Sequence, residues 1–184
     1  MTRESTLVEL VDADGAAIGQ TTVALAHTEP GQLHRAFSVL LVDPDGRLLL
    51  QQRAAGKTRF ALRWANACCG HPAPGQSVVD AASRRLAEEL GLRSVVLTPV
   101  GVYVYRAPDP ISQLVEHEYD HVLVGHLPTD PAVRPDPAEV AALRWADPVR
   151  LRDELVAAAW SYAPWLAGVM SVWESAGVEP SGGR

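Results

Sequence analysis

The 184-residue sequence has only two cysteines, and they stand side by side at Cys68 and Cys69. A disulfide between neighbouring residues is implausible, because the bridge needs a wider spacing of the two Cα atoms. Two free thiols indicate a reducing compartment. The opening residues, Met-Thr-Arg-Glu-Ser-Thr, include an acidic residue and lack the apolar core of a secretion signal. We therefore expect a cytoplasmic protein.

Long leucine-rich runs, dense basic tracts and internal repeats are also missing. The charge-free stretch over residues 155–173 contains a proline, a glycine and two serines, so it predicts two buried helical pieces and no membrane span. The formal net charge of -6 argues against a nucleic-acid partner, because phosphate backbones are bound by clustered Lys and Arg.

Acidic residues are absent from one segment, between Asp45 and Asp80. The same segment carries five basic residues: Arg47, Arg53, Lys57, Arg59 and Arg63. A locally cationic pocket can therefore lie within an acidic protein. This pattern favours a small anionic substrate.

The length and the 47% apolar content are typical of one domain with a substantial core. We predict one domain over residues 1–176 and a disordered tail over residues 177–184. Apolar patterns predict strands at residues 7–11, 37–42, 47–52, 95–106, 119–126 and 143–145. Helical spacing predicts helices between Ser77 and Gly91, over 148–159 and over 164–176, the last two opened by proline. This order indicates an α/β sandwich with a mixed sheet.

Histidines and glutamates provide candidate metal ligands. Glu116 and Glu118 are separated by one residue before a strand, so both side chains face one side if the strand already includes Glu116. With His27, His34 and His71 they form a mixed nitrogen and oxygen set that suits Zn, Mn or Fe. Taken singly, each is more often an ordinary surface residue.

The helix after Ser77 carries Arg85 and Glu89 four residues apart, on one face. Such a pair is usually an exposed ion pair of about 0.5 kcal/mol. The surrounding sequence suggests more than an ion pair here, because the run from Gly70 to Leu92 resembles the Nudix signature. Gln76 and Arg85 stand where that signature has two glutamates, so the carboxylate array that a Nudix hydrolase uses for magnesium is depleted.

These departures occur together with three further motifs: Cys69-Gly70-His71-Pro72, Tyr105-Arg106-Ala107 and Glu116-His117-Glu118. The combination resembles type I isopentenyl-diphosphate isomerases, over most of the chain from Leu7 to Trp173. The resemblance implies a Nudix-like α/β/α sandwich with a mixed sheet. It also implies an isomerase that interconverts isopentenyl diphosphate and dimethylallyl diphosphate, with a prenyl diphosphate as substrate.

The resemblance assigns roles to individual residues. The five residues His27, His34, His71, Glu116 and Glu118 would hold Mn²⁺ or Zn²⁺. Cys69 and Glu118 would transfer protons on opposite faces of the substrate. Tyr105 and Trp165 would face a tertiary carbocation, although core packing alone also explains a tryptophan in an apolar segment.

The diphosphate would be bound by Arg53, Lys57 and Arg85, and Glu89 would hold a bridging Mg²⁺. In the family a lysine usually stands four residues before the first metal histidine, where this chain has Val23. Either the diphosphate is bound less tightly here, or Arg59 substitutes for that lysine.

Two other functions remain open from the sequence. A Nudix hydrolase of a nucleoside diphosphate derivative is favoured by Glu88 and Glu89 and disfavoured by Gln76, Arg85 and the cysteine. A non-catalytic metal-binding or ligand-binding domain is the other alternative, and Val23 is the residue that suggests it.

Overall fold

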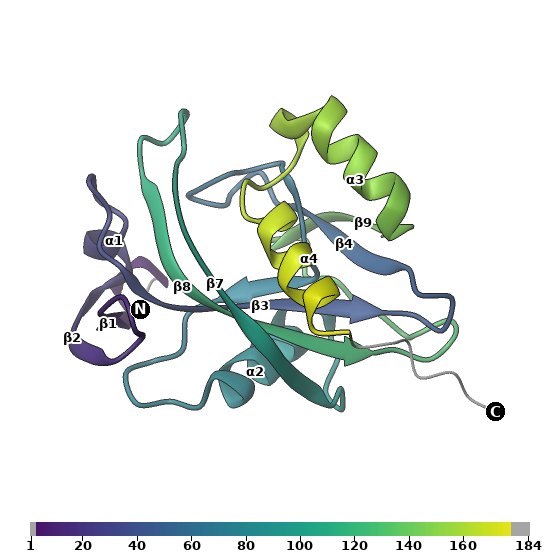
Figure 1. Ribbon diagram of the computed structural model, residues 1–184, viewed down its shortest axis with the longest axis horizontal. Coiled ribbons are helices and arrows are strands. Elements are labelled where there is room, and N and C mark those ends of the chain that lie inside the picture. Colours follow the sequence, from purple (N-terminus) through teal and green to yellow (C-terminus); the bar gives the residue numbers. More distant parts are fainter. Residues whose placement is uncertain (1–2, 178–184) are drawn as a thin grey trace.

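The computed structural model describes residues 3–177, and it contains one nine-stranded sheet with helices on both faces (Figure 1). The strands are β1 (Leu7–Val11), β2 (Ala17–Thr22), β3 (His34–Val42), β4 (Leu48–Arg53), β5 (Trp64–Ala65), β6 (Cys68–Gly70), β7 (Leu97–Pro108), β8 (Val115–His126) and β9 (Val140–Ala146). The helices are the 3-10 turn η1 (Arg3–Ser5), α1 (Val23–Ala26), α2 (Val78–Leu90), α3 (Pro148–Ala157), the 3-10 turn η2 (Ala159–Ser161) and α4 (Leu166–Ser175).

β3 is the central strand, and its neighbours make the sheet mixed. It pairs in parallel with β8 from His34 opposite Glu118 to Val42 opposite His126. Its other edge pairs with β6 in the antiparallel direction, with Ser38 opposite Cys69. β8 pairs antiparallel with β7, and β4 pairs antiparallel with β3, β5 and β9. The predicted α/β class with a mixed sheet is confirmed.

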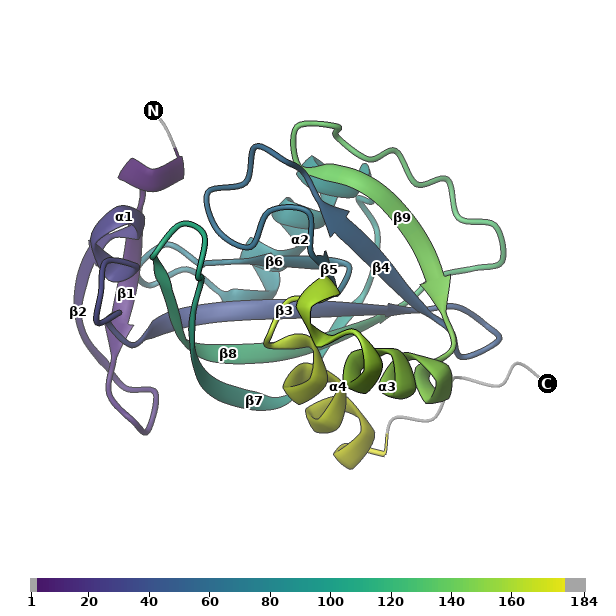
Figure 2. The same ribbon diagram turned by 90° about the horizontal axis from the view of Figure 1, so that it is seen from above.

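Alternating side chains of β3 supply two separate cores. Phe37, Val39 and Leu41 pack with apolar residues of α2, in what we call the α2-side core. Leu40 and Val42 pack with residues of α4, in the α4-side core. This period of two is what an extended strand buried on both faces requires. The α2 helix therefore covers one face of the sheet, and α3 and α4 lie over the opposite face (Figures 1 and 2).

Local sequence signals explain the best-predicted elements. The Ser77 hydroxyl accepts the backbone N–H of Asp80 at the start of α2, and Gly91 ends the helix with a left-handed φ of 71°. The Asp43 carboxylate accepts the N–H groups of Asp45 and Arg47 and closes the turn of the β3–β4 hairpin. Both elements have the predicted positions.

Several elements differ from the prediction. β8 begins at Val115, four residues earlier than predicted, and the short elements β2, β5, β6 and α1 were not predicted at all. Pro148 occupies the first turn of α3 as expected, whereas Pro164 precedes α4, whose N-cap is Trp165. Residues 178–184 of the predicted tail lie outside the described residues. Within residues 3–177, no helix is long and apolar enough to cross a bilayer.

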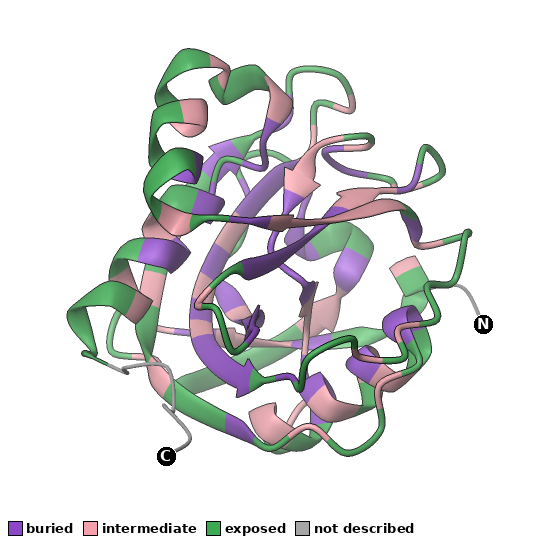
Figure 3. Cartoon of the chain, turned by 90° about the vertical axis from the view of Figure 1, so that its right-hand side faces the viewer, coloured by how far each residue is buried: buried purple, intermediate pink, exposed green. Residues whose placement is uncertain are grey.

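β3, β4 and β8 are buried along most of their length, whereas β2 and β7 are largely exposed, and the helices expose one side to solvent (Figure 3). α4 approaches β7 closely because Gly168 has no side chain. A Cβ added at Gly168 would lie 2.1 Å from the ring of Tyr103. The close approach brings the start of α4, with Trp165, towards the aromatic residues of β7.

Candidate active site and metal centre

Strand alternation places the acidic residues of β8 on the α4 side of the sheet. Glu116, Glu118 and Asp120 have the same parity as Val122 and Val124, which belong to the α4-side core. Because β8 already includes Glu116, the expectation that Glu116 and Glu118 face the same side is confirmed. Glu118 stands opposite His34 of β3 and Tyr105 of β7, its register partners on the two neighbouring strands.

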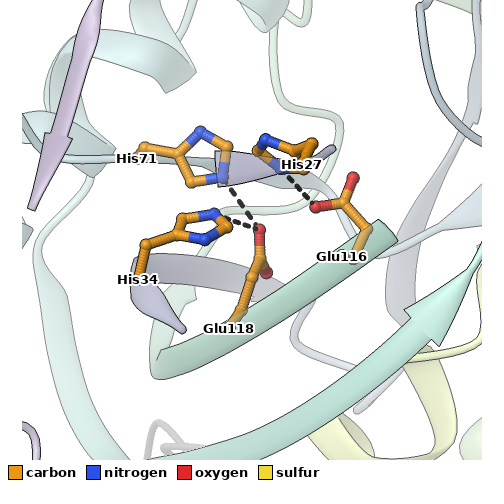
Figure 4. Close-up of side chains that lie close together, drawn as sticks. All are labelled: His27, His34, His71, Glu116 and Glu118. Atoms are coloured by element: carbon orange, nitrogen blue, oxygen red, sulfur yellow. Dashed lines mark hydrogen bonds and ion pairs between the residues drawn. The ribbon is translucent and has the colours of Figure 1, made fainter. Parts of the chain in front are cut away.

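The five predicted metal ligands form one cluster, although they come from four separate parts of the chain (Figure 4). One ligand atom from each of His27, His34, His71, Glu116 and Glu118 lies within 4.8 Å of all the others. The Nε2 atom of His27 lies 2.7 Å from Glu116 Oε2, and that of His71 lies 2.8 Å from Glu118 Oε1. The Nε2 atom of His34 lies 3.8 Å from Glu118 Oε1, too far for a hydrogen bond.

The imidazoles are held in an orientation that suits metal binding. The Nδ1 atoms of His27 and His34 lie 2.7 and 2.8 Å from the carbonyl oxygens of Val23 and Gln32, which leaves both Nε2 atoms directed at the cluster. The Nε2 atom of His34 is fully buried without a hydrogen-bond partner. A metal-bound histidine usually donates one ring N–H to a carbonyl oxygen and binds the metal through the other ring nitrogen. The residues therefore fit a divalent metal ion.

Burial and neighbouring charges favour the neutral, ligating form of His34 and His71. Burial and the charge of the neighbouring His27 together lower the pKa of His34 to about 4. Burial and the charges of His34 and His27 hold the pKa of His71 well below its ordinary value. A metal ion binds imidazole only in the deprotonated form. His34 and His71 are thus in their metal-binding form at neutral pH.

The two glutamates of the cluster have opposite pKa shifts. Burial would raise the pKa of Glu116, but hydrogen bonding to His27 and the charges of His27 and Arg59 hold it well below the ordinary value. The pKa of Glu118 is raised well above that value, by burial and by the charges of Glu116 and Asp120. Two carboxyl groups on one strand can therefore be in different protonation states.

The cysteines lie on opposite faces of β6. Cys68 is completely buried in the α2-side core, whereas the half-buried Cys69 packs against the α4-side core. Both thiols are free, as predicted. Burial raises the pKa of Cys69 to about 12, so its side chain is a protonated thiol at neutral pH. Cys69 is therefore able to donate a proton.

A cavity of about 490 Å³ brings together most of the residues that the sequence singled out. Its walls include Arg53, Lys57, Arg59, Cys69, His71, Arg85, Tyr105, Glu116, Glu118 and Trp165. The thiol of Cys69 and the carboxyl group of Glu118 line the same cavity. His27, His34 and Glu89 are buried, at 1% exposure or less.

Aromatic rings form one wall of this cavity. The Tyr105 hydroxyl donates to Glu118 Oε2 at 2.7 Å, and the Tyr105 and Trp165 rings lie 6.0 Å apart. Trp165 is only 3% exposed, and it belongs both to the α4-side core and to the cavity wall. Core packing and a role in the cavity are therefore compatible for this residue.

Lys57 and Arg85 of the cavity contact carboxylates, whereas Arg53 donates to the backbone oxygens of Arg59 and Phe60. Arg85 contacts Glu88 at 2.5 Å and also pairs with Glu89, and Lys57 lies 3.5 Å from Glu89. Because Glu89 is 1% exposed, the Arg85–Glu89 pair is not the exposed helix pair that its spacing alone would indicate. The Arg53 guanidinium lies 5.5 Å from the centre of the Trp165 ring. The cationic side of the cavity is next to the aromatic wall.

Sequence reasoning missed several charged contacts at the cavity. Glu139 pairs with both Arg3 and Lys57, and Arg3 itself lines the cavity. Arg59 lies 3.0 Å from Glu116 and 3.1 Å from Glu4. No spacing or motif links partners that are so far apart along the chain. Val23 and Arg59 both line the cavity, so Arg59 lies in the same cavity as the position where the family usually has a lysine.

Comparisons with known proteins show the family of the chain. The NUDIX domain model matches residues 32–166. A protein from Nocardia farcinica named isopentenyl-diphosphate Delta-isomerase is 59% identical over 175 residues, which are 95% of this chain and 98% of the relative. The chain belongs to the isopentenyl-diphosphate Delta-isomerase family. Another isopentenyl-diphosphate Delta-isomerase, from Streptomyces coelicolor, is 49% identical over 83% of this chain and 76% of its own length.

Solved structures support the fold of this isopentenyl-diphosphate Delta-isomerase family member. The crystal structure of a Deinococcus radiodurans protein matches with a TM-score of 0.68 and 18% identity, over 91% of this chain and 99% of that one. A Nudix hydrolase from M. smegmatis matches with a TM-score of 0.59 and 20% identity, over 96% and 98% of the two chains. At these identities the likeness concerns the fold, which is the predicted Nudix fold.

Proposed function

We propose that the protein interconverts isopentenyl diphosphate and dimethylallyl diphosphate. The observation that carries the proposal is a single cavity lined by the Cys69 thiol, the Glu118 carboxyl group and a set of cations. The allylic shift needs one proton delivered to the terminal methylene carbon and another removed from the carbon nearer the diphosphate. Two proton-transfer groups in one cavity meet that need.

Cys69 and Glu118 are the proposed proton-transfer pair. One group protonates the terminal carbon, and the other removes the proton from the carbon nearer the diphosphate. In the reverse direction the two groups exchange roles. A turnover leaves one group with an extra proton and the other without its own, so proton exchange with solvent restores both. The Tyr105 hydroxyl, 2.7 Å from Glu118, is placed to take part in that exchange.

The proposed intermediate is a tertiary carbocation, which must be kept from water. The faces of Tyr105 and Trp165 attract positive charge, with a contribution of about 2 kcal/mol where the ring and the cation are desolvated. Trp165 is almost completely buried, which supports this role. The same rings exclude water from the part of the cavity next to Cys69.

The basic residues Arg53, Lys57 and Arg85 are proposed to bind the diphosphate, because guanidinium and ammonium groups bind phosphate oxygens strongly. Glu89 lies between Lys57 and Arg85 and is proposed to hold a bridging Mg²⁺. The cluster of His27, His34, His71, Glu116 and Glu118 is proposed to hold Mn²⁺ or Zn²⁺. When bound there, a divalent ion supplies positive charge that favours the ionised form of Glu118.

The hydrolase alternative has less support from the charged contacts. Arg85 stands where the Nudix signature has a glutamate and pairs with Glu88 and Glu89, so the carboxylate array that a hydrolase would use for magnesium is smaller. We also propose that the protein works in the cytoplasm, where the Cys69 thiol stays reduced. A prenyl diphosphate is the proposed partner.

An experiment in heavy water tests the reaction class directly. The purified protein is incubated with isopentenyl diphosphate and divalent metal, and the product is analysed by NMR. We expect deuterium in the new methyl group of dimethylallyl diphosphate and exchange at the carbon nearer the diphosphate. A parallel panel of nucleoside diphosphate derivatives should release no phosphate. Hydrolysis of a nucleotide without isomerisation would reject the proposal, and turnover of neither substrate would favour a binding domain.

A further inference from the structure

Asn66, between β5 and β6, is completely buried and makes four hydrogen bonds. Its Nδ2 atom donates to the backbone oxygens of Val39 at 3.2 Å and Cys68 at 2.8 Å. Only the amide nitrogen can donate to carbonyl oxygens, so these two contacts determine which way the amide group points. The Oδ1 atom is consequently directed away from the backbone and towards the cavity wall.

That oxygen accepts two hydrogen bonds from residues of the proposed reaction site. The Cys69 Sγ atom lies 3.2 Å from Asn66 Oδ1, and the Trp165 Nε1 atom lies 3.0 Å from it. An indole nitrogen can only donate, so the tryptophan independently requires an oxygen at this position. Every polar atom of the Asn66 side chain therefore has partners, and a buried group satisfied in this way is rigid.

We propose that Asn66 is a positioning residue that orients the Cys69 S–H group and the Trp165 ring together. The proposal rests on the proposed function, because it concerns how the proton-transfer thiol and the cation-facing ring are held. Asn66 has no exposed surface and so acts through these two side chains, without touching the substrate. One amide group then sets both the direction of the thiol and the plane of the indole.

Ser38 provides a matched comparison at the same sulfur atom. Its Oγ atom lies 3.7 Å from Cys69 Sγ, and its hydroxyl donates to Asp120 Oδ2 at 2.7 Å. The longer distance makes Ser38 the weaker acceptor for the thiol proton. If Asn66 has the proposed role, removing the Ser38 hydroxyl should weaken the hydrogen bonding of the Cys69 thiol less than removing the Asn66 amide.

The S–H stretching band in the infrared spectrum reports directly on the thiol hydrogen bond. A Cys68→Ala background leaves Cys69 as the one thiol of the chain. In this background we expect a band at the low frequency of a hydrogen-bonded thiol, and Asn66→Ala should move it to higher frequency. Ser38→Ala should move it less. The measurement needs no turnover, so it also tests the geometry if the proposed function is wrong.

Kinetics separate positioning from substrate binding. Asn66→Ala should lower kcat about 100-fold, the typical effect of misplacing a reacting group. Its KM should change by no more than about twofold, because the proposed diphosphate ligands do not contact Asn66. Trp165→Phe keeps an aromatic face but removes the N–H donor. The double variant should lose less than the product of the two single losses, since both single variants disturb the same contact.

Three results decide the matter. An unchanged S–H band in Asn66→Ala, or a larger shift in Ser38→Ala, would overturn the proposal. So would multiplicative effects of Asn66→Ala and Trp165→Phe on kcat. If Asn66→Ala does not fold, Asn66→Ser keeps a small polar group in the buried site, with its hydroxyl one bond short of the position of Asn66 Oδ1, and the same band shift is expected. An unmodified protein that does not isomerise isopentenyl diphosphate would reject the proposed function alone.

Discussion

Tyr105 and Glu118 stand directly opposite each other on β7 and β8, and the tyrosine hydroxyl donates to the carboxyl group at 2.7 Å. This contact gives the ring and the hydroxyl of Tyr105 separate roles. The ring faces Trp165, and the hydroxyl holds the carboxyl group of the proposed proton-transfer pair.

Tyr105→Phe removes the hydroxyl and keeps the ring. We expect kcat to fall about 100-fold, the lower end of the range for one proton-transfer contribution, with little change in KM. Steady-state kinetics with isopentenyl diphosphate provide the measurement. Tyr119→Phe is a matched control, because the Tyr119 hydroxyl contacts the backbone oxygen of Asp14 at 3.3 Å on the surface. An equal fall of kcat in the two variants would show that the hydrogen bond from Tyr105 to Glu118 does not contribute to the reaction.

Cys69→Ala should abolish isomerisation and leave the metal content unchanged, because the metal cluster consists of nitrogen and oxygen ligands. Metal analysis of the purified variant and the heavy-water assay measure the two properties together. The neighbouring substitution Cys68→Ala is the control. It removes a thiol from the α2-side core and should cost about 1 kcal/mol or more in stability, with activity retained. Full activity of Cys69→Ala would contradict the assigned role.

His34→Asn should remove metal from the cluster, because the buried Nε2 atom of His34 has no hydrogen-bond partner of its own and is directed at the other ligands. A ligand that binds only the folded state stabilises it by about 2.7 kcal/mol at 100 times its Kd. Adding Mn²⁺ or Zn²⁺ after chelation should therefore raise the Tm of the unmodified protein and of the exposed control His126→Asn, but not that of His34→Asn. Equal Tm shifts in all three would argue against the cluster as the binding site.

Asp120→Asn should change how stability depends on pH in the presence of a chelator. Burial raises the pKa of Asp120 to about 8, against the hydrogen bond from Ser38, which lowers it. The native state keeps this proton while the unfolded chain loses it above about pH 4. The contribution of Asp120 to the free energy of unfolding therefore falls as the pH rises from about 4 to about 8.

Asparagine does not titrate, so the variant should gain stability relative to the unmodified protein as the pH rises. One group can change the free energy of unfolding by at most 1.36 kcal/mol per pH unit. We therefore expect the difference between the two proteins to change by about 2 kcal/mol between about pH 5 and about pH 7, and urea unfolding at several pH values measures it. The comparison subtracts the titrating groups that do not interact with Asp120, so a constant difference across this range would mean that Asp120 is ionised in the native state.

The best-predicted parts of the fold carry their own local signals. The α2 helix has a hydroxyl cap at Ser77 and a glycine end at Gly91, and the β3–β4 hairpin has its turn residues. β6 has only three residues, and its position depends on pairing with β3, which no local pattern encodes. The assignment of residues 1–176 to one domain stays a prediction, which limited proteolysis would test.

The site, like the fold, could be predicted from the sequence only in part. Histidine and glutamate are common metal ligands, so the metal cluster could be named from residue types. The role of the Cys69 thiol was named from the resemblance to the isomerase family. Their buried partners could not be named in either way. Asn66 meets Trp165 across 99 residues, and Arg59 meets Glu116 across 57, and such contacts arise only once the strands are assembled. The roles assigned to the individual site residues stay predictions until the variants are measured.

The ion pairs at the beginning of the described chain have a practical consequence for enzymology. Arg3 and Thr6 line the cavity, Arg3 pairs with Glu139, and Glu4 pairs with Arg59. A purification tag joined ahead of Arg3 would begin close in sequence to side chains that line the proposed substrate cavity. Kinetic constants measured on such a fusion would describe the tag as well as the enzyme, so a cleaved tag should precede any comparison of the variants.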